Sequence, residues 1–206
     1  GLPVSRLEKD VIPDCAFQNK SSLQSIILPD RLKGIGVQAF YQCKSLFGSL
    51  IIPEGVTTIA SQAFWGATGM QGMLVLPSTL ERIEDNVFGG CRFVCELKLP
   101  DKLVYIGDGA FADNPYLYGV LVLPVNLQYI GSGSFSGCLS FIGSLKIPQK
   151  VTKILSGAFY SCGFDGILVL HDGIIEIGSG AFGGCKFKGE LNLPKNLVLL
   201  EDNVFK

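Results

Sequence analysis

The sequence predicts a solenoid, in which one chain coils along a single axis and places the same short strand and turns in every coil. Prolines that close an L-x-[LI]-P segment recur every 23 or 24 residues, and His171 takes the place of one of them. These prolines are Pro29, Pro53, Pro77, Pro100, Pro124, Pro148 and Pro194. A second column keeps the same step and consists of Phe17, Phe40, Phe64, Phe88, Phe111, Phe135, Phe159, Phe182 and Phe205. Two columns that stay in step along nearly the whole chain indicate a repeat protein.

The first element of each repeat is a short strand. In residues 143–162, which represent one repeat, the segment G-x-L-x-[LI]-P alternates with a period of two. Leu145 and Ile147 are therefore expected to face inward, while Ser144 and Lys146 face outward. The proline that follows has no N–H to give to a strand ladder, so it ends the strand and turns the chain.

The second part of each repeat is predicted to hold two more inward side chains and a capped helical turn. Val151 and Ile154 are the inward pair in the representative repeat. A Ser or Asp stands three residues before most of the phenylalanines, where its side chain is expected to accept hydrogen bonds from the free N–H groups of a short helical turn. These predicted caps are Ser61, Asp85, Asp108, Ser132, Ser156, Ser179 and Asp202.

The complete pattern, L-x-L-P-x-x-L-x-x-I-G-x-x-A-F-x-x-C, resembles the leucine-rich repeat of the BspA-like cell-surface protein family. The resemblance covers essentially the whole chain, and its most specific part is the A-F-x-x-C block; the asparagine ladder of better-known leucine-rich repeats is missing. The resemblance implies a right-handed leucine-rich repeat solenoid of short parallel strands with short helical or 3-10 turns. It also implies a protein of the extracellular space or the cell surface that binds host proteins or other cells.

The repeats predict a single domain that spans residues 1–206. Residues 1–24 form an irregular N-terminal coil, as expected for a coil that covers the open end of the core, and residues 25–206 hold regular repeats of which the last is incomplete. Because the sequence stops inside a repeat without a polar cap, we expect the natural chain to continue past Lys206. Pairing of the last coil with another copy is the alternative.

Composition and motif context argue against several classes of function. A net charge of −1 provides no field that would concentrate nucleic acid, and no stretch of 18 apolar residues could insert this segment into a membrane. Residues 178–183 satisfy the dinucleotide pattern G-x-G-x-x-G, but similar letters recur at 107–112 and 131–136 at the repeat period, so they are interpreted as turns. No cofactor is therefore predicted.

Catalysis and metal binding are not predicted either. His171 is the only histidine; it occupies a proline position in a turn and lacks a nucleophile partner. Glu96 and Glu190 share an outward column but lie four coils apart, which is too far for the roughly 5–10 Å of a hydrolase carboxylate pair. One thiol per coil forms a line rather than the tetrahedron that a zinc site needs.

Five of the seven cysteines share one column, three residues after the phenylalanine. They are Cys43, Cys91, Cys138, Cys162 and Cys185. Ala67 and Asn114 fill the same column in two other repeats, so we interpret it as an interior seam where cysteine acts as a small apolar residue. Disulfides between adjacent coils remain open, with one thiol left unpaired because the number is odd. Cys15 and Cys95 lie outside the column.

The outward side of the predicted strands is unusually apolar. Several hydrophobic residues there fall in register along two columns, which predicts a contiguous patch of the kind that marks an interaction site. The candidate partner-binding residues are Ile51, Met73, Val75, Lys98, Val120, Val122, Lys146, Ile167 and Val169. The alternative interpretation is that β-branched residues are simply favoured on strands.

Two aromatic rows form a rival candidate surface. Tyr105 and Tyr129 fall at equivalent positions of neighbouring coils, as do Tyr41 and Trp65, so each pair is expected to stack. Exposed aromatic rows could hold a sugar or a peptide, and packing between coils explains them equally well.

Together these patterns predict a noncatalytic protein-binding or adhesion module that presents a strand-lined face to a host or cell-surface protein. The alternative is a structural spacer or a self-associating surface-layer repeat.

Overall fold

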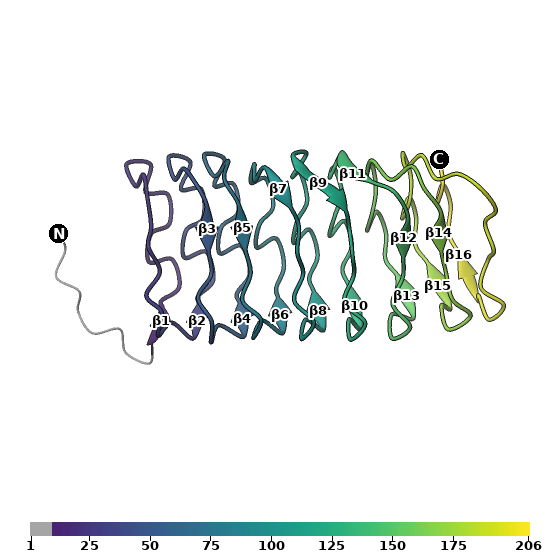
Figure 1. Cartoon of the computed structure of the whole chain (residues 1–206), viewed down its shortest axis with the longest axis horizontal. Coiled ribbons are helices and arrows are strands. Elements are labelled where there is room, and N and C mark those ends of the chain that lie inside the picture. Colours follow the sequence, from purple (N-terminus) through teal and green to yellow (C-terminus); the bar gives the residue numbers. More distant parts are fainter. Residues whose placement is uncertain (1–9) are drawn as a thin grey trace.

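The computed structural model describes residues 10–206, which stack as the coils of a rod-shaped solenoid (Figure 1). Residues 1–9 of the predicted irregular N-terminal coil lie outside the described part of the chain. The solenoid that the repeats predicted is confirmed, and every strand pair in it is parallel. We number the regular coils 1 to 8 by the residues at which their strand segments begin, namely Ser25, Ser49, Met73, Glu96, Val120, Ser144, Ile167 and Glu190.

One side of the rod is a parallel sheet with one two-residue strand in each coil, which we call the tyrosine sheet. Its strands are β1 (Val11–Ile12), β2 (Gly34–Ile35), β4 (Thr58–Ile59), β6 (Arg82–Ile83), β8 (Tyr105–Ile106) and β10 (Tyr129–Ile130). A second sheet continues the row with β13 (Lys153–Ile154), β15 (Glu176–Ile177) and β16 (Leu199–Leu200). In Figure 1 these strands line the lower side of the rod.

The other row of strands comes from the segments that precede the prolines, and it is divided into three short sheets. The first pairs β3 (Leu50–Ile51) with β5 (Leu74–Val75), and the last pairs β12 (Leu145–Lys146) with β14 (Leu168–Val169). Between them lies the sheet of β7 (Cys95–Glu96), β9 (Leu117–Val120) and β11 (Ser140–Ile142). The alternation predicted for residues 143–147 is confirmed, because Leu145 and Ile147 are buried while Ser144 and Lys146 are exposed.

The chain around each phenylalanine forms consecutive turns instead of a regular helix. The residue after the Ser or Asp adopts a positive φ, 59° at Gln62, which prevents a helix from continuing. Alternate N–H groups then point along the rod: those of Gln62 and Phe64 donate to the carbonyl oxygens of Asp85 and Val87, at 2.8 and 3.0 Å. The remaining N–H groups make short bonds of the 3-10 type within the turn, such as Trp65 to Gln62 at 3.1 Å.

The predicted capping role of the Ser and Asp residues is therefore wrong. Where these side chains form hydrogen bonds, they reach the next coil: Oδ1 of Asp85 accepts from the N–H of Asp108 at 2.9 Å, and Oδ1 of Asp108 accepts from the N–H of Ser132 at 2.8 Å. The hydroxyl of Ser179 likewise donates to the carbonyl oxygen of Asp202. The Ser and Asp side chains bond to the next coil because the N–H groups of their own turn are already bonded. Alternate N–H groups donate to the next coil and the others donate within the turn.

The core is a continuous column of stacked phenylalanine rings. Phe135 and Phe159 are typical, with ring centroids 5.5 Å apart and an angle of 3° between the rings. Val151 and Ile154 are fully buried beside this column, as predicted. In the last coil Phe205 stacks on Phe182 but stays 43% exposed, because no described coil follows it.

The cysteine column is an interior seam, as predicted, and all seven thiols of the chain are free. Inter-coil disulfides, which the sequence left open, are not formed. Burial raises the pKa of Cys91 to about 12 and that of Cys185 to about 11, because the thiolate loses its hydration in the interior. Within the described part of the chain, no helix has the length and apolar character needed to cross a membrane.

Candidate protein-binding face

The strand segments before the prolines present two outward residues in each coil, one on either side of a leucine whose side chain points into the core. We call the outward residues of coils 2 to 7 the display face. Its first column holds Ser49, Met73, Glu96, Val120, Ser144 and Ile167, and its second column holds Ile51, Val75, Lys98, Val122, Lys146 and Val169.

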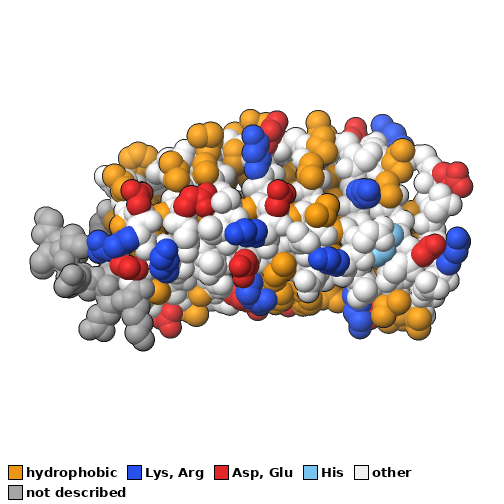
Figure 2. Space-filling view, turned by 60° about the horizontal axis from the view of Figure 1, so that its bottom comes forward, with side chains coloured by type: hydrophobic (Ala, Val, Ile, Leu, Met, Phe, Trp, Pro, Cys, Tyr) orange, Lys and Arg blue, Asp and Glu red, His pale blue; other side chains and the backbone are white. Residues whose placement is uncertain are grey.

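All nine predicted site residues lie on the display face and all are exposed. The exposed fraction of the seven apolar ones ranges from 40% at Val75 to 70% at Val122. Figure 2 shows hydrophobic side chains gathered along one long edge of the rod and interrupted by basic ones, above a band of mixed charge. The predicted alternation between inward and outward positions is therefore correct, while the binding role of these residues remains a prediction.

Backbone pairing places some of these side chains directly beside one another. Ile51 lies opposite Val75 in the β3–β5 ladder, and Lys146 lies opposite Val169 in the β12–β14 ladder. Side chains that are partners across a parallel ladder stand on the same face of the sheet. Residues of the second column are thus direct neighbours within each of these strand pairs.

A cleft of about 500 Å³ opens between coils 3 and 4, where the ladder is interrupted. Met73, Val75 and Lys98 line it, so it brings together predicted site residues of two coils. At its floor the N–H of Leu74 donates to the sulfur of Cys95 at 3.4 Å instead of to a backbone carbonyl. The interruption leaves an open space between two coils.

A second cleft, of about 490 Å³, lies between coils 5 and 6. Val120, Val122 and Lys146 line it together with the exposed Val125. Both large clefts have apolar walls and one lysine, the first is also lined by Glu96, and they lie two coils apart. A smaller cleft of about 270 Å³ lies beside Ile51.

The strand register changes in the middle of the rod, next to the two large clefts. The repeat places Cys95 in line with Gly119, but its ladder partner is Leu117, two residues earlier. Tyr118 likewise pairs with Ser140 instead of Ile142. Strands β9 and β11 therefore pair upstream of the leucines of coils 5 and 6. The segments that hold these leucines lie on either side of the cleft between coils 5 and 6.

The sequence interpretation missed a third outward column, two residues before the first. Its apolar members are Phe47, Val94, Tyr118 and Ile142, all of which are exposed. Strands β9 and β11 extend into this column, so its side chains continue the display face sideways. Extending the period-two alternation upstream past the glycine, as in Y-G-V and I-G-S, would have revealed it.

In the first column, two serine hydroxyls form hydrogen bonds with the backbone of the next coil. Oγ of Ser49 accepts a hydrogen bond from the N–H of Met73 at 3.0 Å, and Oγ of Ser144 accepts one from the N–H of Ile167 at 2.9 Å. These hydroxyls bond to the backbone of the next coil. The charged residues of the display face are Glu96, Lys98 and Lys146.

On the opposite side of the rod, the aromatic rows stack as predicted. The rings of Tyr105 and Tyr129 lie 4.6 Å apart at 5°, and those of Tyr41 and Trp65 lie 5.1 Å apart at 17°. The guanidinium carbon of Arg82 sits 3.9 Å from the centroid of the Tyr105 ring. Both faces of Tyr105 are therefore covered, which leaves mainly its edge for a sugar or a peptide.

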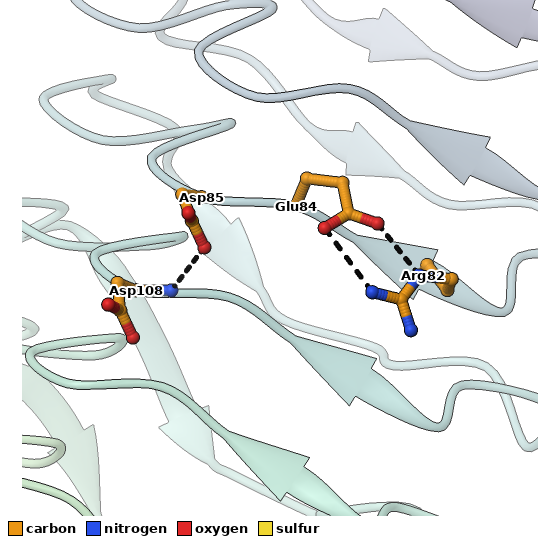
Figure 3. A network of polar contacts seen from close by, with 4 residues as sticks. All are labelled: Arg82, Glu84, Asp85 and Asp108. Atoms are coloured by element: carbon orange, nitrogen blue, oxygen red, sulfur yellow. Dashed lines mark hydrogen bonds and ion pairs between the residues drawn. The ribbon is translucent and has the colours of Figure 1, made fainter.

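Polar contacts of Arg82 with Glu84 and of Asp85 with Asp108 lie on the same coils (Figure 3). Arg82 donates two hydrogen bonds to Glu84, at 2.7 and 3.3 Å, and the contact raises the pKa of the guanidinium. The pKa values of Tyr105 and Tyr129 are raised, first by loss of hydration and then by a nearby carboxylate, that of Asp85 for Tyr105 and that of Asp108 for Tyr129. These polar contacts connect neighbouring coils and fix Arg82 over the ring of Tyr105.

The remaining motifs serve turns. Nε2 of His171 lies 2.9 Å from the carbonyl oxygen of Pro148, and Nδ1 accepts from the N–H of Gly173 at 3.1 Å, so the ring holds two turns together. At Gly178 a side chain would meet the backbone nitrogen of Ser156 at 2.6 Å, which explains why the G-x-G-x-x-G letters recur with the coil. No three His, Cys, Asp or Glu side chains converge on a metal position in residues 10–206.

Comparisons with known proteins agree with this architecture. A family model described as BspA type leucine rich repeat region, in six copies, matches residues 10–120 and 118–206. A leucine-rich repeat protein of T. pallidum is 27% identical and superposes with a TM-score of 0.68, covering 85% of this chain and 81% of its own. No curated protein matches the sequence.

Two further solved structures are similar in fold. A leucine-rich repeat protein of Bacteroides ovatus is 21% identical with a TM-score of 0.58, over 81% of this chain and 48% of that one. A leucine-rich cell surface protein of Faecalibacterium prausnitzii is 21% identical with a TM-score of 0.53, over 95% of this chain and 69% of that one. Since the family model covers nearly the whole described chain, the resemblance found in the sequence is confirmed. The chain belongs to the BspA-type leucine-rich repeat family.

Proposed function

We propose that this chain is a noncatalytic protein-binding module of the extracellular space or the cell surface, and that the display face is its binding site. The observation that carries the proposal is the set of exposed apolar side chains on the outward side of stacked strands, interrupted by Lys98 and Lys146. Exposed apolar patches on soluble proteins often mark interaction sites.

The two lysine-lined clefts support the proposal further. Met73 and Val75 form apolar walls in one cleft, Val120 and Val122 form them in the other, and Lys98 and Lys146 stand at the rims. Apolar centres with charged rims are the usual composition of protein interfaces. A partner would bury apolar side chains in the clefts and place acidic or polar groups near the lysines.

The family supports the proposed location. The similar protein of Faecalibacterium prausnitzii is described as a cell surface protein. Presenting side chains to a partner at a surface needs a rigid support and no conformational change. A solenoid with one continuous core provides such a support. Adhesion to host proteins is the form of binding that we propose for this chain.

A direct test compares binding of the wild type and a Val75→Glu, Val122→Glu, Val169→Glu variant to a panel of host matrix and cell-surface proteins. The matched control carries Val37→Glu, Ile175→Glu and Val198→Glu, which change exposed apolar residues away from the display face. Circular dichroism and thermal melting establish that both variants are folded. Loss of binding in the first variant alone supports the proposal. Equal binding by all three proteins would contradict it.

The second candidate function is a structural spacer or a self-associating repeat. It predicts a solution mass well above 22.1 kDa, or no binding to any protein of the panel.

A further inference from the structure

We infer that the cleft between coils 5 and 6 holds an extended peptide segment of a protein partner, which pairs through its backbone with the strand edges along the cleft. The inference rests on the proposed function, because it names the form of the partner that the display face receives. It follows from a set of backbone groups that are paired in other coils and are unpaired at this cleft.

The paired coils show where these backbone groups normally bond. In coil 2 the N–H of Leu50 donates to the carbonyl oxygen of Met73 in the next coil, at 2.8 Å. In coil 6 the N–H of Leu145 donates in the same way to the carbonyl oxygen of Ile167, at 3.0 Å. The inward residue of a strand segment thus normally donates to an outward residue of the next coil.

The equivalent groups of coil 5 have no such partner. The ladder between β9 and β11 ends at Val120 and Ile142, and the segments beyond it lie on either side of the cleft. Within residues 10–206, the N–H groups of Leu121 and Leu123 donate to no backbone carbonyl. Backbone N–H groups that are buried are almost always paired, so unpaired ones are expected to face solvent or a ligand.

Strand β12 forms the opposite wall of the cleft and is the edge strand of its sheet, which holds only β12 and β14. The N–H groups of Leu145 and Ile147 point to coil 7, at 3.0 and 3.1 Å from their acceptors. Because successive backbone groups of a strand point to opposite sides, the N–H and the carbonyl of Lys146 point into the cleft. Strand edges of this kind accept an additional strand from another chain.

The side chains of the cleft indicate what the added strand carries. Its volume of about 490 Å³ is within the range of ligand sites, and Val120 and Val122 form apolar walls. Lys146 is exposed and forms no ion pair in the part of the chain that the structure describes. An extended peptide places alternate side chains on opposite faces. Apolar residues on either side of an acidic one therefore fit the apolar walls and the lysine together.

The cleft between coils 3 and 4 is a weaker candidate. The N–H of Leu74 already donates to the sulfur of Cys95 there, and Glu96 lines the cleft together with Lys98. One donor is thus occupied, and a carboxylate is already close to the lysine.

Hydrogen exchange of the isotope-labelled whole chain tests the free edge. The amides of Leu121 and Leu123 should exchange at least about tenfold faster than those of Leu50 and Ile52, which occupy the same positions in coil 2 and are paired. Equal protection of the two pairs would show that the ladder is complete at the cleft and would overturn the inference.

The peptide probe is acetyl-Thr-Val-Glu-Val-Thr-amide, followed through the amide signals of the whole chain. We expect a Kd below about 1 mM, with shifts at Leu121, Leu123 and Lys146 and none at Leu50. The same peptide with its three central amides N-methylated keeps its side chains but loses those donors, and it should bind at least about tenfold more weakly.

A charge exchange tests the contact with the lysine. The Lys146→Glu variant should bind the probe at least about fivefold more weakly, and a probe with Lys in place of Glu should restore its affinity to within about threefold of the original pair. Lys150→Glu, which changes an exposed lysine in the following turn of the same coil, is the matched control and should bind the original probe like the wild type.

Three results with the peptide would overturn the inference: no binding up to about 5 mM, equal binding of the N-methylated probe, or shifts away from the cleft. The same amide shifts on raising the concentration of the chain alone would assign the cleft to a second copy and would overturn the choice of partner. A chain that ignores the probe, but loses a panel protein through the three Val→Glu changes, would refute the inference and leave the proposed function standing. Binding of the probe at the cleft, in a chain that binds no panel protein, would support the inference and refute the adhesive role.

Discussion

The thiol of Cys138 donates a hydrogen bond to the carbonyl oxygen of Phe111 in the preceding coil, across 3.3 Å. The same bond joins Cys43 to Phe17, Cys91 to Phe64, Cys162 to Phe135 and Cys185 to Phe159. Asn114 occupies the column once and uses its amide nitrogen for the bond to Phe88, at 2.7 Å. The column is therefore a ladder of short donors between coils as well as a seam of small residues.

This ladder predicts that stability falls in alkaline solution. The thiols of Cys91 and Cys185 keep their protons in the folded state up to pKa values of about 12 and about 11, whereas the unfolded chain releases them near pH 9. Since the unfolded state binds fewer protons above pH 9, the free energy of unfolding decreases as the pH rises from 9 towards 11 and does not change on this account below pH 8. At pH 10 the loss should be roughly 1 kcal/mol per buried thiol.

Urea unfolding at pH 8 and at pH 10 measures this loss. The control is a Cys91→Ala, Cys185→Ala variant, which lacks both groups and should lose less stability between the two pH values. An equal loss in both proteins would show that these thiols do not carry the effect.

The phenylalanine stack predicts a large difference between two changes of the same residue type. Phe135→Ala removes a fully buried ring that contacts rings on both sides, so it should lower the free energy of unfolding by about 3–5 kcal/mol. Phe47→Ala removes a ring that is 64% exposed and should cost less than about 0.5 kcal/mol. Thermal or urea unfolding of both variants checks the prediction, and similar losses in the two would contradict it.

Close approach between coils predicts that Gly131 tolerates no side chain. A Cβ there would overlap the backbone of Gly107 and Asp108 in the preceding coil, so Gly131→Ala should cost more than about 2 kcal/mol. The matched change is Gly48→Ala, where nothing lies within 4 Å and only the φ of 88° opposes the substitution. That variant should lose about 1 kcal/mol. Equal effects in urea unfolding would argue against close approach as the cause.

The contact between Arg82 and Tyr105 predicts a measurable coupling. A double-mutant cycle with Arg82→Ala and Tyr105→Ala should give an interaction free energy of about 0.5–1 kcal/mol, because the guanidinium lies over the ring. The comparison is the ion pair of Lys153 and Glu176, 2.7 Å long, whose lysine side chain is 52% exposed. Its coupling should stay below about 0.5 kcal/mol in the same measurement. A larger coupling in the ion pair than in the stacked pair would contradict this ranking.

Much of the candidate site could be predicted because it depends on local alternation. Val75 and Val122 are exposed and their neighbours Leu74 and Leu121 are buried, because side chains alternate between the two faces of a strand. This alternation can be read from a single strand segment. The stacking of Tyr105 on Tyr129 was predictable for a similar reason, as equivalent positions in consecutive coils of a solenoid are neighbours.

Other features could not be predicted from local patterns. The Ser and Asp residues before each phenylalanine have the sequence signature of helix caps, but Asp85 bonds to the next coil instead. The turn there cannot become a helix, since its N–H groups have a better aligned partner in the neighbouring coil. A pattern that treats each turn by itself contains no information about that partner.

The sequence by itself determined the period of the coil, the inward column of phenylalanines, the thiol seam and the identity of the outward residues. These follow from side-chain direction, which the local backbone sets residue by residue. Only the tertiary structure decided how neighbouring coils pair, including the two-residue change of register between Cys95 and Leu117 and the cleft between coils 3 and 4. Pairing depends on the packing of two segments more than twenty residues apart. Several registers are compatible with the same alternating pattern, and the fit of the buried side chains selects among them.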